Sequence, residues 1–428
     1  MKLITWYLKS NLLIRILAGL ILGAAAGLYF GPAVGVISPV GDVFVKLLKM
    51  IVMPVVISTL IVGAGSIHPA QLGRVGVKAL GIYMVTTAFA VAIGLAFGNL
   101  FKPGQGMTLS GEGAVEKVAT QAMEPTSLTD ILMDIVPTNP FAAMTSGNIL
   151  STIFFCLIVG IAIANLKQNP DDRIRRAGTT IYRFFEGFAE VMYLVVGWIL
   201  QYAPIGVFAL IAVVFGQQGP KAFGPLGMTT LALYLAFITH ILLIYGGGLF
   251  LFKLNPLRFL IKAREAMVTG FITRSSGGTL PVSMEVAQKE MGVDKGVYSF
   301  SLPLGATINM DGTAIYQGVC AVFIGFAIGT PLDFSQQLTI IATAVLASIG
   351  TAGVPGAGSI MLMMVLTSVG LNVEPGTPVA MAYAMIFGID ALLDMGRTGT
   401  NITGDLTVTC IVAKSENAMD MSKWDSQL

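Results

Sequence analysis

The chain has 428 residues, of which 55% are hydrophobic and only 11% are charged, whereas an ordinary soluble domain has roughly 25% charged residues. A soluble fold of this size would expose a largely apolar surface and would associate, so the composition excludes a soluble enzyme and predicts a multi-span membrane protein. The formal net charge of +2 offers no basic surface for nucleic acid. Three cysteines and two histidines lack the spacing of a disulfide framework or a zinc site.

Apolar runs in the first half of the chain are long enough to cross a bilayer core, which takes ~20 residues. They cover 12–32, 43–65, 79–101, 141–166, 187–216 and 226–252. Lysine and arginine gather in alternate loops, so the positive-inside rule places the N-terminus and the loops 67–78, 167–183 and 253–265 in the cytoplasm. The charged start of the chain therefore precedes a first membrane helix and not a cleaved signal. The loop 103–127 is long, polar and glycine-rich, and is predicted to be flexible.

Beyond residue 266, two apolar segments are broken by small and polar residues. The segment 267–292 breaks at Arg274–Pro281, and the segment 338–369 breaks at Gly350–Gly358. The charges at their flanks favour two hairpins that dip into the membrane from opposite sides.

Each hairpin is followed by a predicted membrane helix that carries a polar interruption. The interruptions are Asn309–Thr313 in the run 296–328 and Asp394–Asn401 in the span that starts at 379. Paired, interrupted elements of inverted topology indicate a transporter with a binding site near the membrane midplane. We therefore predict an all-α integral membrane protein of eight transmembrane helices and two re-entrant helical hairpins. Both termini are expected in the cytoplasm, and the protein in the cell (inner) membrane.

Charged residues inside these apolar segments are costly, at least ~2.5–3.5 kcal/mol each. Four acids (Asp311, Asp390, Asp394, Asp405) stand against two bases (Arg274, Arg397), a formal sum of −2. A dry site cannot hold that imbalance at neutral pH, so protons or bound metal cations must offset it. The alternative interpretation of the aspartates is that they cap broken helices.

Arg397 presents a planar fork that matches a carboxylate, and Asp394 lies three residues earlier on the same predicted helix. The two residues can form an ion pair with each other. They can also receive a substrate, with Arg397 taking a carboxylate and Asp394 an ammonium group, while backbone N–H groups at the hairpin tips suit a second carboxylate. A site with these three receptors fits an acidic amino acid, which carries two carboxylates and one ammonium group. Tyr83, Thr86 and Thr87 form a polar cluster that is typical of hydrogen bonding between helices.

The motifs Arg274–Pro281, Asn309–Thr313, Gly350–Gly358 and Asp394–Asp405, together with Tyr202–Phe208, closely resemble those of the dicarboxylate/amino acid:cation symporters. The similarity is greatest to prokaryotic sodium-coupled aspartate/glutamate transporter homologues. It implies a homotrimer in which a mobile transport domain moves like an elevator against a fixed scaffold. The implied division is scaffold helices at 1–78, a transport-domain helix and flexible extracellular loop at 79–127, scaffold helices at 128–225, a transport-domain helix at 226–265, the transport core at 266–416 and a cytoplasmic tail at 417–428.

The resemblance also implies ligand-binding residues. Those for substrate are Arg274, Ser275 and Ser276 at the first hairpin tip, Val354 and Gly358 at the second, and Thr313, Asp394, Arg397, Thr398 and Asn401. One sodium ion would take Gly305, Asn309, Asn401 and Asp405, and a second would take Thr307, Ser348, Ile349 and Thr351. A third would take Tyr83, Thr86, Thr87, Asn309 and Asp311, and Met310 is counted with these cation residues.

Two residues depart from the family pattern. Gly277 stands where close relatives often carry serine, which affects affinity and the gate. Gln317 stands where potassium-countertransporting relatives carry glutamate, which argues against potassium or proton coupling through that position.

The expected function is sodium-coupled uptake of L-aspartate or L-glutamate, with sodium as the coupling ion, no organic cofactor, and the lipid bilayer and two further copies as partners. A proton-coupled glutamate symporter or a C4-dicarboxylate symporter of the same fold stays open as the alternative. A neutral substrate is disfavoured by Arg397. An intramembrane aspartyl protease is disfavoured because Gly388-Ile-Asp390 lacks the extra glycine of the usual protease motif, and a channel because the charges balance on substrate binding.

Overall fold

The structure is a computed structural model that describes residues 12–66, 74–107, 109, 136–146, 148–349, 351, 353 and 355–426. Within these residues the chain is helical, and the one β-type contact is an isolated bridge between Val293 and Met419. In the described part of the chain, five helical stretches are long and apolar enough to cross a membrane: Ile14–Ser66, Arg74–Phe101, Asp172–Leu251, Lys295–Ala327 and Pro378–Ser415. The molecule is therefore a multi-pass membrane protein.

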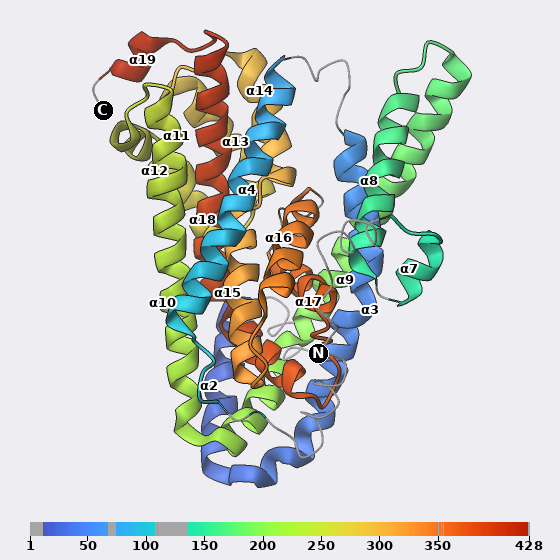
Figure 1. Cartoon of the computed structure of the whole chain (residues 1–428), viewed down its shortest axis with the longest axis vertical. Helices are drawn as coiled ribbons and strands as arrows, with labels where there is room; N and C mark the ends of the chain where they lie inside the picture. Colours follow the sequence, from blue (N-terminus) through green and yellow to red (C-terminus); the bar gives the residue numbers. More distant parts are fainter. Residues whose placement is uncertain are drawn as a thin grey trace, which may run out of the picture.

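One group of helices forms a wall that runs obliquely from the upper right to the bottom of the molecule in Figure 1. It consists of α2 (Leu12–Phe30), the 3-10 helix η1 (Gly31–Ile37), α3 (Ser38–Ser66), α7 (Pro140–Ser146), α8 (Ile149–Leu166) and α9 (Asp172–Gln218). Three glycines spaced by four residues, Gly19, Gly23 and Gly27, let α2 approach α9 closely. A Cβ added at these positions would lie 2.4, 2.6 and 2.4 Å from backbone carbonyl oxygens of α9. Small residues of this kind are what allow membrane helices to pack at short range.

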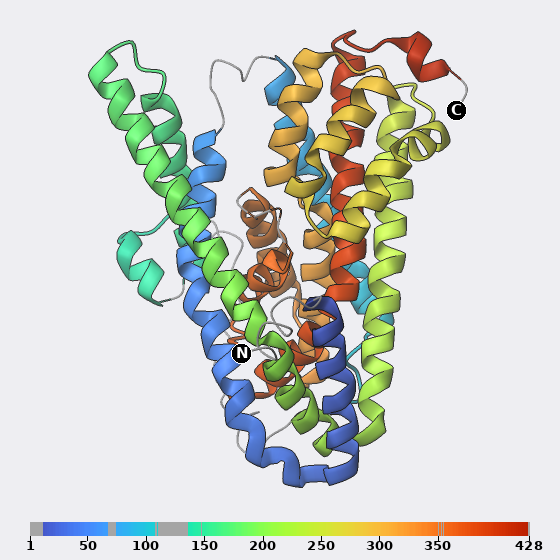
Figure 2. The same ribbon diagram turned by 180° about the vertical axis from the view of Figure 1, so that it is seen from behind.

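A second group faces this wall, and Figure 2 shows the same division from behind. It contains α4 (Arg74–Phe101), η2 (Gly219–Ala222), α10 (Phe223–Thr239), the π-helical turn η3 (His240–Tyr245), α11 (Gly246–Leu251), α12 (Pro256–Thr273), α13 (Ser276–Lys289), α14 (Lys295–Ile308), α15 (Asp311–Ala327) and α18 (Pro378–Ser415). Between the groups lie α16 (Phe334–Ser348) and α17 (Ala357–Ser368), which contact helices of both.

Most of the predicted helix breaks are present. The first hairpin turns at Arg274, which has a positive φ of 55°, and Ser275, which caps α13 by accepting a hydrogen bond from Gly278 N at 3.0 Å. The next helix is interrupted at Asn309 and Met310, and the second hairpin breaks between α16 and α17.

Two predictions are wrong. The stretch 167–183 was expected to be a loop, but most of it belongs to α9, because Asp171 caps a helix start by accepting from Arg173 N at 2.8 Å. The predicted interruption at Asp394–Asn401 is absent, since α18 runs unbroken through the motif. The motif contains no proline, so each residue can keep its place in the helical hydrogen-bond ladder. The predicted flexible loop at 103–127 lies largely outside the described residues.

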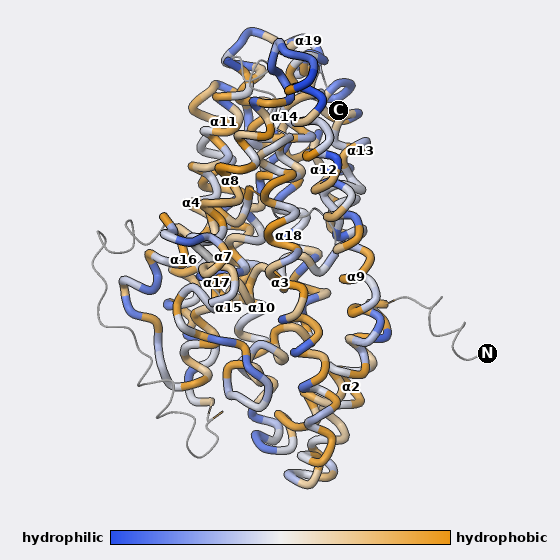
Figure 3. Tube along the Cα trace, turned by 90° about the vertical axis from the view of Figure 1, so that its right-hand side faces the viewer, coloured by the Kyte–Doolittle hydropathy of each residue, from blue (hydrophilic) through white to orange (hydrophobic). Residues whose placement is uncertain are grey.

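The end of the chain forms a small structured unit at the hydrophilic end of the molecule (Figure 3). Residues 417–426, which include α19 (Met421–Asp425) and are called the C-terminal clasp below, pack against the turn between α13 and α14. Asp420 N donates to Gly292 O at 2.8 Å, and Asp294 N donates to Ala418 O at 2.9 Å. The indole of Trp424 is buried. The clasp therefore fixes the base of the first hairpin.

Candidate functional site

A narrow pocket lies where the two hairpin tips meet the start of α15 and the middle of α18. Its free volume is about 10 Å³, about enough for one water molecule. The lining residues are Arg274, Ser276, Met310, Thr313, Thr351, Gly353, Gly358, Asp394, Arg397, Thr398 and Asn401. Most residues predicted to bind substrate are thus brought together. Val354 lies outside the described residues, and its role stays a prediction.

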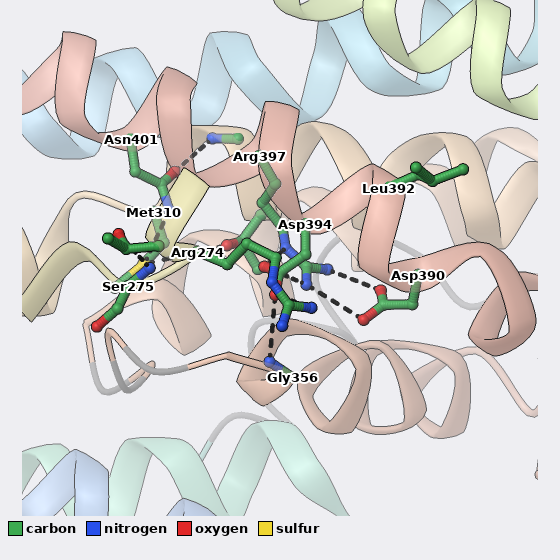
Figure 4. A network of polar contacts seen from close by, with 12 residues as sticks. Arg274, Ser275, Met310, Gly356, Asp390, Leu392, Asp394, Arg397 and Asn401 are labelled. Carbon is green, nitrogen blue, oxygen red and sulfur yellow. Dashed lines mark hydrogen bonds and ion pairs between the residues drawn. The ribbon is translucent and has the colours of Figure 1, made fainter. Parts of the chain in front are cut away.

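Arg397 is the buried cation at the centre of this pocket (Figure 4). Its Nε and Nη2 atoms lie 3.0 and 2.7 Å from Asp394 Oδ1, so the two residues form the ion pair that their spacing allows. Nη1 lies 3.2 Å from Asp390 Oδ1, and the ring of Tyr316 packs 4.5 Å from Cζ. Asp390 is one helical turn before Asp394, and its part in this cluster was missed by the sequence reasoning. The signal available was its spacing of seven residues from Arg397, which places both on one face of a helix.

Both hairpins also reach Asp394. Arg274 Nη1 lies 4.0 Å from Asp394 Oδ2, and Gly356 N donates to the same oxygen at 3.4 Å. Gly358 lies directly against the guanidinium, because a Cβ added there would be 2.5 Å from Arg397 Nη1. The second hairpin tip therefore needs glycine to approach the charged cluster.

The two hairpin tips are hydrogen bonded to each other. Gly353 O accepts from Ser275 Oγ at 2.8 Å and from Gly277 N at 3.2 Å. Ser275 itself therefore contacts the opposite tip and does not line the pocket. A Cβ added at Gly277 would have only Gly353 O within 4 Å, at 3.6 Å. The structure thus has room for a serine at this position.

A second polar cluster surrounds Asp405. Asn309 Nδ2 donates to Asp405 Oδ1 at 2.9 Å and to Asn401 O at 3.1 Å. Asn401 Oδ1 accepts from Gly312 N at 2.8 Å, and its amide nitrogen lies 3.3 Å from Met310 Sδ. A Cβ added at Gly305 would be 2.5 Å from Asp405 Oδ1. The residues predicted for the first sodium ion are therefore in one place.

A further set of polar contacts surrounds Asp311. Thr87 Oγ1 donates to Oδ1 at 2.6 Å, and Tyr245 Oη donates to Oδ2 at 2.8 Å. His240 Nε2 lies 3.2 Å from Oδ2. The predicted cluster in α4 thus includes a direct partner of Asp311, while Tyr83 Oη donates to Ser301 O at 3.0 Å and Thr86 Oγ1 donates within its own helix to Tyr83 O. The sequence reasoning missed His240 and Tyr245.

Residues predicted for another sodium ion lie at the wall of a wider cavity. Thr307, Ile349 and Thr351 line a space of about 450 Å³ between α3, α9 and the hairpins. The hydroxyl groups of Thr307 and Ser348 donate to carbonyl groups of their own helices, and that of Thr351 donates to Ala347 O in the last turn of α16. Their free lone pairs and the carbonyl groups at the helix ends are oxygen ligands, as hard monovalent cations require.

The donor set in these clusters fits alkali cations better than transition metals. No group of three histidine, cysteine, aspartate or glutamate side chains converges in the described part of the chain. Carboxylate, amide, hydroxyl and backbone oxygens gather instead around Asp405 and Asp311. Oxygen donors without imidazole or thiolate clusters are typical of sites for hard cations.

Comparison with known proteins agrees with this geometry. Residues 12–415 match the model of the sodium:dicarboxylate symporter family. The chain is 34% identical to a proton/sodium-glutamate symport protein of Geobacillus stearothermophilus, over 98% of this chain and 96% of that protein. It is 32% identical to a proton/glutamate-aspartate symporter of Escherichia coli (97% and 95%) and 33% identical to a C4-dicarboxylate transport protein of Laribacter hongkongensis (98% and 93%). The chain therefore belongs to the sodium:dicarboxylate symporter family and is a transporter, not an enzyme.

Proposed function

We propose that this transporter is a symporter that takes up L-aspartate or L-glutamate together with sodium ions. The observation that carries the proposal is the position of Arg397 beside Asp394 at the pocket. The guanidinium is a receptor for the side-chain carboxylate of the substrate, and Asp394 is a receptor for its ammonium group. Backbone N–H groups at the hairpin tips suit the second carboxylate.

The proposal includes movement, because the pocket is too small for an amino acid while the tips are joined at Gly353. Substrate entry requires the tips to separate, and the packing of α2, α3, α8 and α9 as one wall fits a fixed scaffold. We therefore include in the proposal the homotrimer, the elevator movement of the helices facing the wall, the domain boundaries given above, and the cytoplasmic termini in an inner membrane.

Sodium coupling is supported by two aspartates that form no ion pair with arginine or lysine in the described part of the chain. Asp311 and Asp405 are held by hydroxyl, imidazole and amide groups. Cations are the counter-charge that such a site lacks.

The alternative is a proton-coupled glutamate symporter or a C4-dicarboxylate symporter. One observation favours the dicarboxylate: Asp394 already has Arg397 as its partner, so it does not need a substrate ammonium group. Relatives at similar identity carry both kinds of name.

Uptake into proteoliposomes separates these possibilities. We expect L-aspartate and L-glutamate to accumulate when sodium is outside, and uptake to cease when choline replaces sodium at fixed pH. Asp394→Asn should remove amino acid uptake by the loss of the ammonium receptor. Succinate uptake by the wild type that exceeds amino acid uptake, and that survives in Asp394→Asn, would identify a dicarboxylate carrier instead.

A further inference from the structure

The π-helical turn η3 interrupts an otherwise α-helical stretch that runs from α10 to α11. Single π turns inside α-helices cost regular geometry and are frequent at functional sites. This turn begins with His240 and ends with Tyr245, whose rings pack edge to face with centroids 4.6 Å apart. Both side chains are buried.

Both residues of the turn contact the same carboxylate oxygen. Tyr245 Oη and His240 Nε2 lie 2.8 and 3.2 Å from Asp311 Oδ2, whereas Thr87 on α4 takes Oδ1. Gly404 makes the contact possible, because a Cβ added there would lie 2.3 Å from Tyr245 Oη. The backbone of α18 thus leaves space for the tyrosine to reach Asp311.

The donor roles follow from the acceptor. An ionised carboxylate can only accept, so Nε2 must carry the hydrogen that it shares with Oδ2. The other ring nitrogen, Nδ1, is buried and has no hydrogen-bond partner within the described residues. A partnerless buried nitrogen is costly. An apolar side chain would fill the same space without this cost, so packing alone does not explain a histidine at position 240.

We propose that His240, with Tyr245, is a positioning residue that sets the cation selectivity of the Asp311 site; this inference rests on the sodium coupling proposed above. Two donors on Oδ2 hold the carboxylate in one orientation and leave Oδ1, on the side of Thr87, as the oxygen offered to a cation. Without them the carboxylate can rotate and offer both oxygens, which admits larger cations. The pair therefore favours small monovalent cations.

The test measures cation binding without transport. Full-length protein in nanodiscs is titrated at fixed pH with sodium, lithium or potassium chloride, and thermal unfolding is followed in the absence of amino acid. We expect sodium to raise the unfolding temperature of the wild type. In His240→Ala the sodium midpoint should rise about tenfold, and the preference for sodium over potassium should shrink.

Two further variants keep the outcome clear if His240→Ala folds poorly. His240→Gln retains an N–H donor of similar reach, so it should restore most of the sodium midpoint and the selectivity. Tyr245→Phe removes a single hydroxyl group from the same oxygen and should shift both quantities as His240→Ala does. Tyr234→Phe is the matched control, because its hydroxyl donates to Leu392 O and not to Asp311.

A packing role for the pair would lower stability equally in every salt and leave the ratio of the midpoints unchanged, which overturns the inference. Equal behaviour of His240→Gln and His240→Ala also overturns it. A wild type whose stability is the same in sodium and in choline would refute the sodium coupling itself, and the inference with it.

Discussion

Two acidic clusters lie along α18, and they differ in whether basic side chains balance their charge. The arginine cluster (Asp390, Asp394, Arg274, Arg397) holds two acids and two bases, joined by ion pairs. The aspartate cluster (Asp311, Asp405) holds two acids whose described partners are hydroxyl, amide and imidazole groups, with no arginine or lysine among them. The formal charge of −2 expected from the sequence is therefore located in the aspartate cluster alone.

This difference separates the tasks of the two clusters. Substrate that binds at the arginine cluster must compete with ion pairs already formed within the protein. A cation that binds at the aspartate cluster compensates charge that the protein leaves uncompensated, which is favourable in a region of low dielectric constant. The contrast is consistent with the proposed function, in which cations bind at the aspartate cluster and the substrate binds at the arginine cluster.

The largest effect is expected for Arg397→Ala, which breaks the arginine cluster. Removing one partner of a buried, hydrogen-bonded charge pair between protein and ligand costs about 2–5 kcal/mol of binding free energy, and about 3 kcal/mol corresponds to more than a hundredfold in affinity. We expect calorimetry in sodium to show no binding of L-aspartate or L-glutamate. Arg397→Lys keeps the charge without the fork and should recover only part of the affinity. Micromolar binding by Arg397→Ala would refute the substrate assignment.

The next prediction is that the loss of one carboxylate changes the stability in opposite directions in the two clusters. Asp405→Asn keeps an oxygen for Asn309 but removes an uncompensated buried charge, so the protein in choline should become more stable, by up to about 2.5–3.5 kcal/mol. Asp394→Asn removes a partner of Arg397 and should destabilise the protein in the same buffer. Thermal unfolding in choline and in sodium measures both. Destabilisation by both variants in choline would mean that the clusters do not differ as described.

The sequence was sufficient to predict the helical fold, three of the four broken elements and most residues of the pocket, because glycine, proline and buried charge are strong local signals. It failed at Asp394–Asn401, where polar residues in an apolar run resembled an interruption although tertiary contacts satisfy them within a continuous helix. It also missed His240 and Tyr245. A lone histidine in an apolar run gives no signal until the fold brings Asp311 to it from 71 residues away.

A smaller effect is expected where the hairpin tip meets the arginine cluster. Gly358→Ala places a Cβ 2.5 Å from Arg397 Nη1, so the guanidinium or the tip must shift, and we expect the amino acid affinity to fall about tenfold, or about 1.4 kcal/mol. Gly277→Ala is the matched control on the opposite tip, where the added Cβ meets only Gly353 O at 3.6 Å. Its affinity should stay within about threefold of the wild type, or about 0.7 kcal/mol. Calorimetry compares the two, and equal losses would show that the contact with Arg397 is not the cause.

The smallest effect concerns a buried cation. Its partners are backbone carbonyl groups, whereas the buried acids of the aspartate cluster are held by hydrogen-bond donors. The ammonium group of Lys262 is buried and donates to Glu290 O at 2.8 Å and to Lys423 O at 3.0 Å, joining α12 to the C-terminal clasp. Hydrogen bonds to charged groups contribute about 1.5–3 kcal/mol, but Lys262→Met also removes the cost of burying the charge, so a net loss of stability below the lower figure is expected. The loss should appear as faster hydrogen exchange at Asp294 and Asp420, whose amides join the clasp to the hairpin base. Lys289→Met, which removes an exposed pair with Glu285, is the control and should leave that exchange unchanged. Since neither lysine lines the pocket, amino acid binding should be retained in both; its loss in Lys262→Met alone would mean that the clasp holds the first hairpin tip in place as well as its base.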